Sequence, residues 1–299
     1  MEYRYIIVLG IALLSVSAII LYATYPIRPI IRVRIATTTS LYATGLLEYI
    51  SSRFTEVHRN TELQFIAVGS GAALRYAERG DVCAILIHEP GLEKLYIERG
   101  AIEGQRILAY SFFVIVGPEN DPANVSSALD VVDAFRRVYR VAEEGLIRFI
   151  SRADNSGTHN REMKIWNLIG VSPRDKPWYI ECGCGMDQAL IMASEFKGYT
   201  LSDVGTYTVL KAKGRIQNVK ILYGNASDDL MLNIYSGYLA SGCRGTERMY
   251  AELFLDFIYS DPDIVNSFGV EEYGVRLFYH SRHYEGSILD AWNRLALSG

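Results

Sequence analysis

The stretch IRVRIATTTSLYATGLLEYISSRF, residues 31–54, changes its periodicity part-way along. Its first six residues alternate apolar and basic side chains, the period of two that is typical of a β-strand. From residue 41 onward the apolar residues recur at helical spacing. The residues of this apolar face are Leu46, Leu47, Ile50 and Phe54. The stretch therefore predicts a strand followed by a helix.

The same order repeats downstream. LQFIAV (residues 63–68) predicts a second strand, and it leads through Gly69-Ser70-Gly71 into an alanine-rich helix start. VCAILI (residues 82–87) is a continuous apolar run, as expected of a strand buried on both faces of a parallel sheet. Alternating strands and helices of this kind predict an α/β, doubly wound lobe.

A second set of elements follows a Pro/Asn/Asp-rich break, PENDP, that ends a strand at residues 111–117. The first expected element is a helix with Val131, Phe135, Val138 and Ala142 on one face. A strand at 146–151, a helix at 186–196 and strands at 218–224 and 234–240 follow. The last is an amphipathic helix at 247–260, whose apolar face is Tyr250, Leu253, Phe254, Phe257 and Ile258.

We expect two α/β lobes with a ligand cleft between them. The expected divisions are residues 1–30 as an N-terminal segment, 31–116 and 232–299 as the first lobe and 117–231 as the second, with crossings near 116–119 and 230–235.

The amino-acid composition and net charge indicate which kinds of binding partner to expect. The chain has 299 residues, 49% of them hydrophobic and 21% charged, which is typical of a folded globular protein. Its formal net charge of −4 does not favour a nucleic-acid partner. Because the overall field of an acidic protein repels an anion, any anion site must depend on local, directed donors.

The N-terminus carries an uncharged apolar run at residues 5–25. This run is about as long as the roughly 20 residues that cross a bilayer as a helix. It is longer than the apolar core of a signal peptide, about 7–15 residues. We therefore expect an extracytoplasmic protein, with a retained membrane anchor favoured over a cleaved signal; cleavage would give a secreted or periplasmic protein.

Four cysteines, Cys83, Cys182, Cys184 and Cys243, fit an exported protein that forms disulfides. Cys182 and Cys184 are predicted to lie too close in sequence for an easy mutual bridge, so each would pair elsewhere or stay a thiol. Cys-x-x-Cys pairs are absent from the sequence, and this argues against a cysteine metal site.

Three junctions share one design, in which small hydroxyl or glycine residues lie between a strand and a helix. They are Thr37-Thr38-Thr39-Ser40, Gly69-Ser70-Gly71 and Ser156-Gly157-Thr158. A helix N-terminus presents unpaired N–H groups and a partial positive charge, hydroxyls add donors, and glycine lets an anion approach the backbone. Each junction alone could be an ordinary helix cap. Taken together, they predict an anion site.

Arg152 strengthens that prediction, because it ends the strand that leads into the third junction. A surface salt bridge is the plain alternative for such an arginine. Asp154, two residues on, is well placed to orient the guanidinium so that it donates to an oxyanion.

Six blocks occur in order along the chain: ATTTS, AVGSGAAL, HEPGLEKLYIERG, SRADNSGTHNRE, WYIECGCGM and YTLSDVGTY. Through these blocks the chain resembles the tungstate-binding proteins of ABC transporters over residues 32–256. The resemblance implies a type II periplasmic-binding-protein fold that closes on a tetrahedral oxyanion, most of all tungstate, without a cofactor or a metal ion. It implies a monomer that delivers the anion to a permease and its ATPase. The residues that it assigns to the ligand are Thr38, Thr39, Ser40, Ser70, Gly71, Arg152, Ser156, Gly157 and Thr158. The chain departs from the family at ECGCGM, and the tail after Gly269 has no counterpart in it.

Several alternatives remain open at this point. Molybdate, phosphate and sulfate are rival ligands of the same fold, and an anchored oxyanion sensor is a rival role. Phosphate at neutral pH carries a proton and benefits from a carboxylate acceptor such as Glu89, whereas tungstate needs donors only. An enzyme is not expected: His159 and an aspartate (Asp154 or Asp203) could join a serine in a triad, but the Gly-x-Ser-x-Gly elbow is missing.

Overall fold

The computed structural model describes residues 3, 15 and 29–297. The apolar run at 5–25, apart from residue 15, lies outside the described residues, so its anchoring role stays a prediction. Within the described part of the chain, no helix combines the length and apolarity needed to cross a membrane.

The first lobe begins with the predicted strand–helix alternation. Its elements in chain order are β1 (Ile31–Thr38), α2 (Thr39–Ala43), α3 (Leu46–Val57), β2 (Thr61–Val68), α4 (Ser70–Arg79), β3 (Ala84–Ile87) and α5 (Pro90–Glu98). The three predicted strands are confirmed, and β3 is buried throughout. The single helix expected at 41–54 is wrong. Gly45 takes a left-handed φ of 83° and breaks it into α2 and α3.

The second lobe contains the predicted helices around residues 131–142 and 186–196. Its elements are η1 (Val125–Ser127), α6 (Val131–Glu143), β5 (Phe149–Ser151), α7 (Gly157–Leu168), β6 (Tyr179–Glu181), α8 (Met186–Phe196), β7 (Thr200–Asp203), α9 (Val204–Ala212), β8 (Val219–Tyr223) and η2 (Asp229–Met231). The predicted apolar face of α6 is confirmed, since all four of its residues are buried. The bounds of α8 agree with the expected 186–196.

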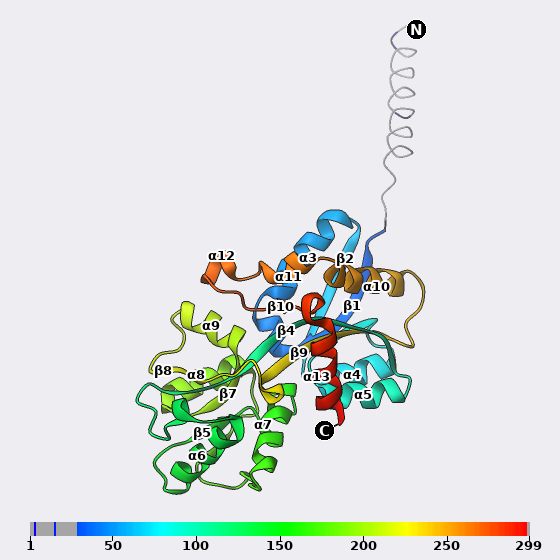
Figure 1. The fold of residues 1–299 in the computed structure, drawn as a ribbon. Helices are drawn as coiled ribbons and strands as arrows, with labels where there is room; N and C mark the ends of the chain where they lie inside the picture. The colour runs from blue at the N-terminus through cyan, green and yellow to red at the C-terminus, as the bar shows by residue number, and fades with distance from the viewer. Residues whose placement is uncertain (1–2, 4–14, 16–28, 298–299) are drawn as a thin grey trace.

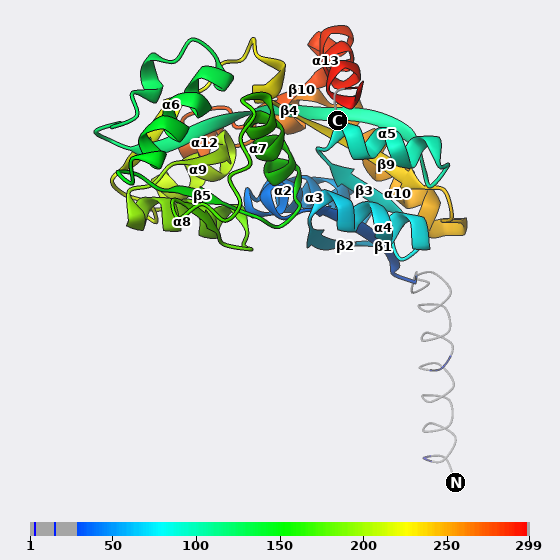
Figure 2. The ribbon, with the colours of Figure 1, turned by 90° about the horizontal axis from the view of Figure 1, so that it is seen from below.

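Two long strands connect the lobes, as Figure 1 shows. β4 (Ile102–Pro118) pairs with β9 (Leu232–Ala240) as far as Phe112, and from Phe113 onward it pairs with β7 and β8 of the second lobe. The change of partner comes before the expected crossing at 116–119, because β4 is one continuous strand that belongs to both sheets. In Figure 2 the lobes lie side by side, with α2 and α7 in the middle.

The sheet of the first lobe has the order β10-β4-β9-β3-β1-β2. β1 is parallel to both β2 and β3, so the carboxyl ends of these three strands meet at one edge. β9 runs antiparallel to β3 and to β4. In the second lobe β5 and β6 form a short parallel pair.

The C-terminal residues add structure to the first lobe. These elements are α10 (Gly245–Ser260), α11 (Pro262–Asn266), α12 (Val270–Tyr273), β10 (Tyr279–His280), η3 (Ser281–Tyr284) and α13 (Glu285–Leu297). Phe254 and Ile258 of the predicted α10 face are buried, but Leu253 is exposed, so the buried stripe is rotated towards Ala251 and Leu255. β10 pairs with β4.

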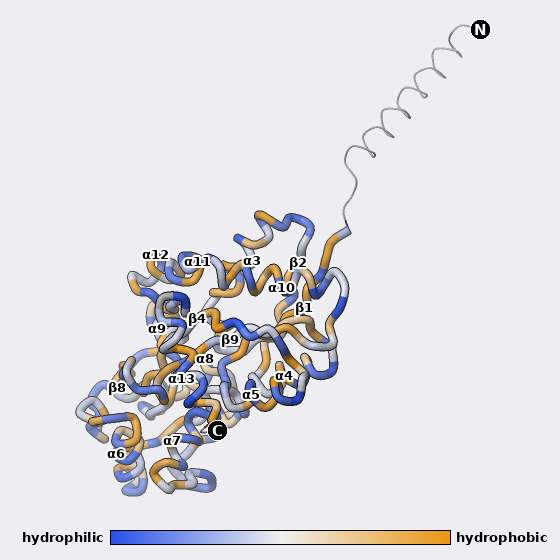
Figure 3. The backbone as a smooth tube through the Cα atoms, turned by 45° about the vertical axis from the view of Figure 1, so that its right-hand side comes forward, coloured by the Kyte–Doolittle hydropathy of each residue, from blue (hydrophilic) through white to orange (hydrophobic). Residues whose placement is uncertain are grey.

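Each lobe has its own apolar core. One cluster gathers around β1, β3 and α10, and a second gathers around α6, Phe149 and Trp166. Hydrophobic and hydrophilic stretches alternate along the outer helices, as in α3 and α6 in Figure 3, because each helix buries one face only.

All four cysteines form disulfides. Cys83 pairs with Cys243 and Cys182 pairs with Cys184. The expectation that the second pair lies too close in sequence to bridge is wrong. Gly183 between them takes a left-handed φ of 59°, which lets the chain turn back within one residue.

Candidate functional site

The first two predicted junctions lie at one edge of the sheet, because β1 and β2 are parallel and in register to their last residues, Thr38 and Val68. Thr38 caps α2: its Oγ1 accepts from the Leu41 N–H at 3.3 Å and lies 3.3 Å from the Ser40 Oγ. Ser70 opens α4 and is completely buried. Two helix N-termini therefore point to the same edge.

The third junction comes from the second lobe and opens α7. Ser156 is the N-cap, and its Oγ accepts from the His159 N–H at 3.4 Å. Gly157 lies against His88, since a Cβ added there would come within 2.9 Å of the His88 Cε1 and 3.1 Å of its carbonyl oxygen. Any side chain at this position would require His88 to shift. At Gly71 an added Cβ would meet nothing closer than 3.6 Å, so a side chain there is not sterically excluded.

Arg152 joins the two lobes. Its side chain is 1% exposed, and its Nη2 donates to the Thr39 Oγ1 at 2.9 Å and to the Asp154 Oδ2 at 2.5 Å. The predicted orienting role of Asp154 is confirmed. The Nε of Arg152 donates to the Cys184 carbonyl oxygen at 3.3 Å. These contacts leave the Nη1 as the free edge of the guanidinium.

Three buried donors lack a hydrogen-bond partner among the described residues. They are the Ser70 Oγ, the Arg152 Nη1 and the Thr158 Oγ1. Other buried hydroxyls in the described chain share this property, but these three are members of the predicted anion set and come from both lobes. Leaving a buried polar group unpaired costs about 1–3 kcal/mol, and more for a charged one. An anion that accepts from all three would remove that cost.

His88 lies among these donors but was not predicted from the sequence as a site residue. Its Nε2 is 3.5 Å from the Ser40 Oγ, and its ring packs 5.2 Å from that of Tyr235. Burial, followed by the positive charge of Arg152, lowers the pKa of His88 to about 3, so the imidazole is neutral at physiological pH. One sequence signal was present, since His88 directly follows β3, whose carboxyl end adjoins the same edge.

The remaining predicted residues have structural partners. His159 is buried, and its Nδ1 accepts from the Asn155 N–H at 3.0 Å, so it shapes the loop before α7. Asp203 is also buried and caps α9 through the Thr206 N–H at 2.7 Å and the Thr206 Oγ1 at 2.8 Å. Burial raises the pKa of Asp203. Neither residue has the geometry of a triad member with an adjacent serine.

A buried carboxyl supports β5, the strand that directly precedes Arg152. Glu162 accepts from the Ser151 Oγ at 2.9 Å, the Tyr179 hydroxyl at 2.6 Å and the Trp166 Nε1 at 3.2 Å. Burial is the main cause that raises the pKa of Glu162 to about 7. This carboxyl therefore holds its proton in the folded chain at a pH where an unfolded glutamate has lost it.

We expect Glu162 to make the stability of the protein decrease as pH rises. Because its pKa is raised in the folded state, its contribution is complete below the unfolded value near 4.5 and is lost as pH rises through about 7. A shift of that size corresponds to up to about 3 kcal/mol. Glu162→Gln should therefore flatten the fall in unfolding free energy between pH 5 and pH 8, measured by urea denaturation. Glu144→Gln, at an exposed position, should leave the pH dependence of the unfolding free energy as in wild type. Equal pH dependence in wild type, Glu162→Gln and Glu144→Gln would contradict the role given to Glu162.

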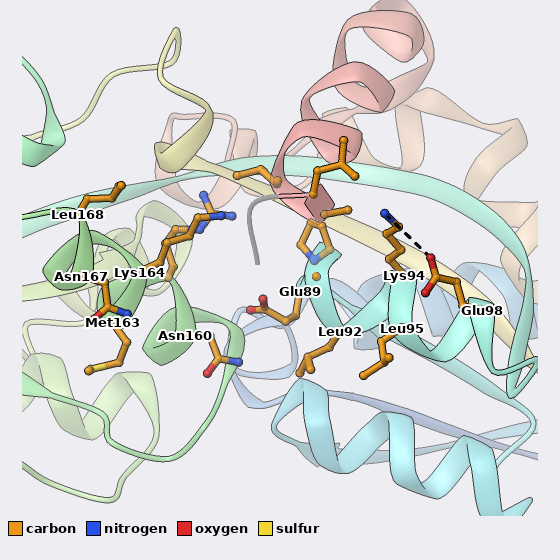
Figure 4. A pocket seen from close by; sticks show the side chains of 16 residues that line it. Glu89, Leu92, Lys94, Leu95, Glu98, Asn160, Met163, Lys164, Asn167 and Leu168 are labelled. Atoms are coloured by element: carbon orange, nitrogen blue, oxygen red, sulfur yellow. Dashed lines mark ion pairs between the residues drawn. The ribbon is translucent and has the colours of Figure 1, made fainter.

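A groove of about 920 Å³ lies next to the junctions, between α5, α7 and α13. Figure 4 shows Glu89 at its inner end, between Asn160 of α7 and Leu92 of α5. Burial raises the pKa of Glu89 to about 7. None of the predicted anion-site residues lines this groove, and it is much larger than a four-oxygen anion requires. The enclosed donors, rather than the groove, form the candidate site.

Comparisons with known proteins support the two-lobed fold. The sequence pattern of the PBP superfamily domain matches residues 26–262. The chain is 32% identical over 251 residues to the tungstate-binding protein TupA of Peptoclostridium acidaminophilum, covering 82% of this chain and 84% of the relative. Among solved structures it is similar to TupA of Desulfovibrio alaskensis G20 (TM-score 0.68, 33% identity, 85% of this chain and 99% of the other). It is also similar to the tungstate ABC transporter structure from Geobacter sulfurreducens (TM-score 0.63, 32% identity, 83% and 99%).

Proposed function

The chain belongs to the PBP superfamily and, within it, to the tungstate-binding proteins of ABC transporters, and from that premise we propose that it captures tungstate between its two lobes and delivers it to a transporter permease. The ligands in this proposal are the residues predicted from the sequence, which are Thr38, Thr39, Ser40, Ser70, Gly71, Arg152, Ser156, Gly157 and Thr158. No covalent step and no cofactor are involved.

The observation that carries the proposal is the set of unpartnered buried donors, the Ser70 Oγ, Arg152 Nη1 and Thr158 Oγ1. A fully deprotonated tetrahedral oxyanion offers acceptors only and would pair with all of them. The nearby carboxylate of Asp154 is already engaged by Arg152, and Asp203 is engaged by the α9 N-terminus. Protonated phosphate also needs an acceptor, and both of these carboxylates already accept from protein donors.

The mechanism that we propose is closure of the lobes about β4 and β9. The bond from the Arg152 Nη2 to the Thr39 Oγ1 crosses between the lobes. Gly205 of α9 lies close to Thr44 of the first lobe, since an added Cβ would be 3.3 Å from the Thr44 Cγ2. Donors of both lobes can satisfy one anion only in such a closed arrangement, so closure signals a loaded protein to the permease.

The setting of this function is part of the proposal. The chain would act as a monomer at the extracytoplasmic face of the membrane, held by residues 1–30, and would pass its anion to a permease driven by an ATPase. The tungstate-binding and ABC-transporter names of similar proteins support the transfer to a permease.

Calorimetry of the full-length protein with tungstate, molybdate, sulfate and phosphate tests the proposed function. We expect tungstate to bind at least as tightly as molybdate and much more tightly than phosphate. Tight phosphate binding with micromolar or weaker tungstate binding would overturn the proposal.

Ser70→Ala should lower tungstate affinity without lowering stability. A neutral hydroxyl that donates to a charged oxygen contributes about 1.5–3 kcal/mol of binding. The buried Oγ has no partner among the described residues, so its removal costs the fold little or nothing. Titration calorimetry and thermal unfolding measure the two effects, and Ser52→Ala on the exposed face of α3 is the control. A fall in Tm with unchanged affinity would remove Ser70 from the site.

A further inference from the structure

The Cys182–Cys184 disulfide lies beside Arg152. The bridge occupies the short loop between β6 and α8, and both cysteines are half-buried. The other bridge, Cys83–Cys243, lies before the amino end of β3 and after β9, at the end of the sheet opposite the strand carboxyl termini. The two disulfides therefore differ in their relation to the anion site.

The bridged loop holds Arg152 from two sides. The Cys182 N–H donates to the Ser151 carbonyl at 3.0 Å and the Cys184 N–H donates to the Arg152 carbonyl at 3.1 Å, which extends the pairing of β5 with β6. The carbonyl oxygen of Cys184 in turn accepts from the Arg152 Nε at 3.3 Å. One residue of the bridge thus binds both the backbone and the side chain of the arginine.

The orientation of the guanidinium plane depends on this contact. Asp154 and Thr39 both accept from the Nη2, so they fix one edge of the plane. The Cys184 carbonyl fixes the Nε, and together these contacts determine where the unpartnered Nη1 points. Because the guanidinium is planar and rigid, losing one anchor lets the whole fork tilt.

The surrounding backbone needs such support. Ala153 and Asn155, on either side of Asp154, take left-handed φ values of 50° and 56°, which non-glycine residues adopt only when their surroundings hold them. The loop of the bridge contains Gly183 and Gly185, and glycine loses more conformational entropy on ordering than any other residue. Without a covalent link, a loop of this composition would hold the Cys184 carbonyl poorly.

We propose that the Cys182–Cys184 disulfide is a positioning element of the anion site, which fixes the Cys184 carbonyl against Arg152 and makes oxyanion affinity depend on the redox state of this bridge. The proposal rests on the proposed function. Reduction by a small dithiol supplies two electrons and two protons: the S–S bond breaks into two thiols, and the reductant closes into its own disulfide. The loop then loosens, and the Nη1 is no longer held towards the anion.

The test compares the two bridges in the full-length protein. We expect C182S/C184S to weaken tungstate binding by about 10-fold, the scale of one hydrogen bond to a charged group, with little change in Tm. C83S/C243S should lower Tm and leave the dissociation constant within twofold. Treating C83S/C243S with dithiothreitol should reproduce the loss of affinity, and reoxidation should reverse it. Unchanged affinity in C182S/C184S would overturn the proposal.

A double-mutant cycle separates positioning from general damage. In an Arg152→Ala background, removing the bridge should change the dissociation constant less than twofold, because the group it positions is gone. Additive losses would show that the bridge acts otherwise and would overturn the proposal.

A readout without ligand keeps this inference separate from the proposed function. Exchange of the Arg152 Nε–H with solvent, followed by NMR on arginine-labelled protein, should speed up in C182S/C184S and not in C83S/C243S. If wild-type protein bound none of the four oxyanions, the proposed function would fail, and this exchange rate would still decide whether the bridge positions Arg152. An unchanged rate contradicts the positioning role.

Discussion

Arg152→Ala is expected to weaken tungstate binding by about 2–5 kcal/mol, the scale for losing one partner of a buried charge pair. The guanidinium is 1% exposed, bridges the lobes through Thr39 and offers its Nη1 to the enclosed site. Removing it takes away the one positive side chain of the predicted anion set and leaves Asp154 without its ion-pair partner. Calorimetry at fixed ionic strength measures the change.

Two further variants sharpen this prediction. Arg152→Lys keeps the charge but cannot present a planar fork, so we expect an intermediate loss. Arg148→Ala removes an exposed arginine, stacked on Phe196 just before β5, and should leave binding unchanged. Normal affinity in Arg152→Ala would place the arginine outside the site.

Trp292→Ala is expected to lower the free energy of unfolding by about 3–5 kcal/mol, the usual range for truncating a buried tryptophan. Trp292 of α13 is 5% exposed, and its Nε1 donates to the Glu93 Oε2 at 2.7 Å. Glu93 is completely buried and also accepts from the Tyr238 hydroxyl at 2.7 Å. The variant therefore leaves a cavity and removes one of the donors to a buried carboxyl. Urea denaturation measures the loss.

Trp292→Phe keeps a buried aromatic ring but loses the N–H and part of the indole, so its loss should lie between those of wild type and Trp292→Ala. Leu289→Ala, at a position 39% exposed on the same helix, serves as the matched control and should cost less than 1 kcal/mol. A comparably small loss in Trp292→Ala would mean that α13 contributes little to the fold. The helix lies beyond residue 262, where the match to the family pattern ends.

The strands and the three junctions could be predicted because their signals are local. β1 and β2 follow from residue alternation or apolar runs, and each junction directly follows a strand or opens a helix. The pairing of Arg152 with Asp154 was equally local, since one residue separates them. Because parallel strands end at the same edge of a sheet, the first two junctions could also be predicted to lie close together in space.

The parts that the sequence missed depend on tertiary contacts or on single backbone angles. His88 begins the block HEPGLEKLYIERG, but its place at the site depends on Gly157 of the other lobe packing against it. The break at Gly45 and the turn at Gly183 each depend on one left-handed residue, which periodicity does not detect. The change from one lobe to the other comes before the predicted crossing at 116–119, because β4 pairs with strands of both lobes.

Anomalous diffraction at a tungsten absorption edge, from crystals grown with tungstate, would locate the bound anion. We expect one dominant peak enclosed by the junctions, with its oxygens within hydrogen-bond reach of the Ser70 Oγ, the Arg152 Nη1 and the Thr158 Oγ1. A dominant peak in the groove between α5, α7 and α13, with none among these donors, would contradict it.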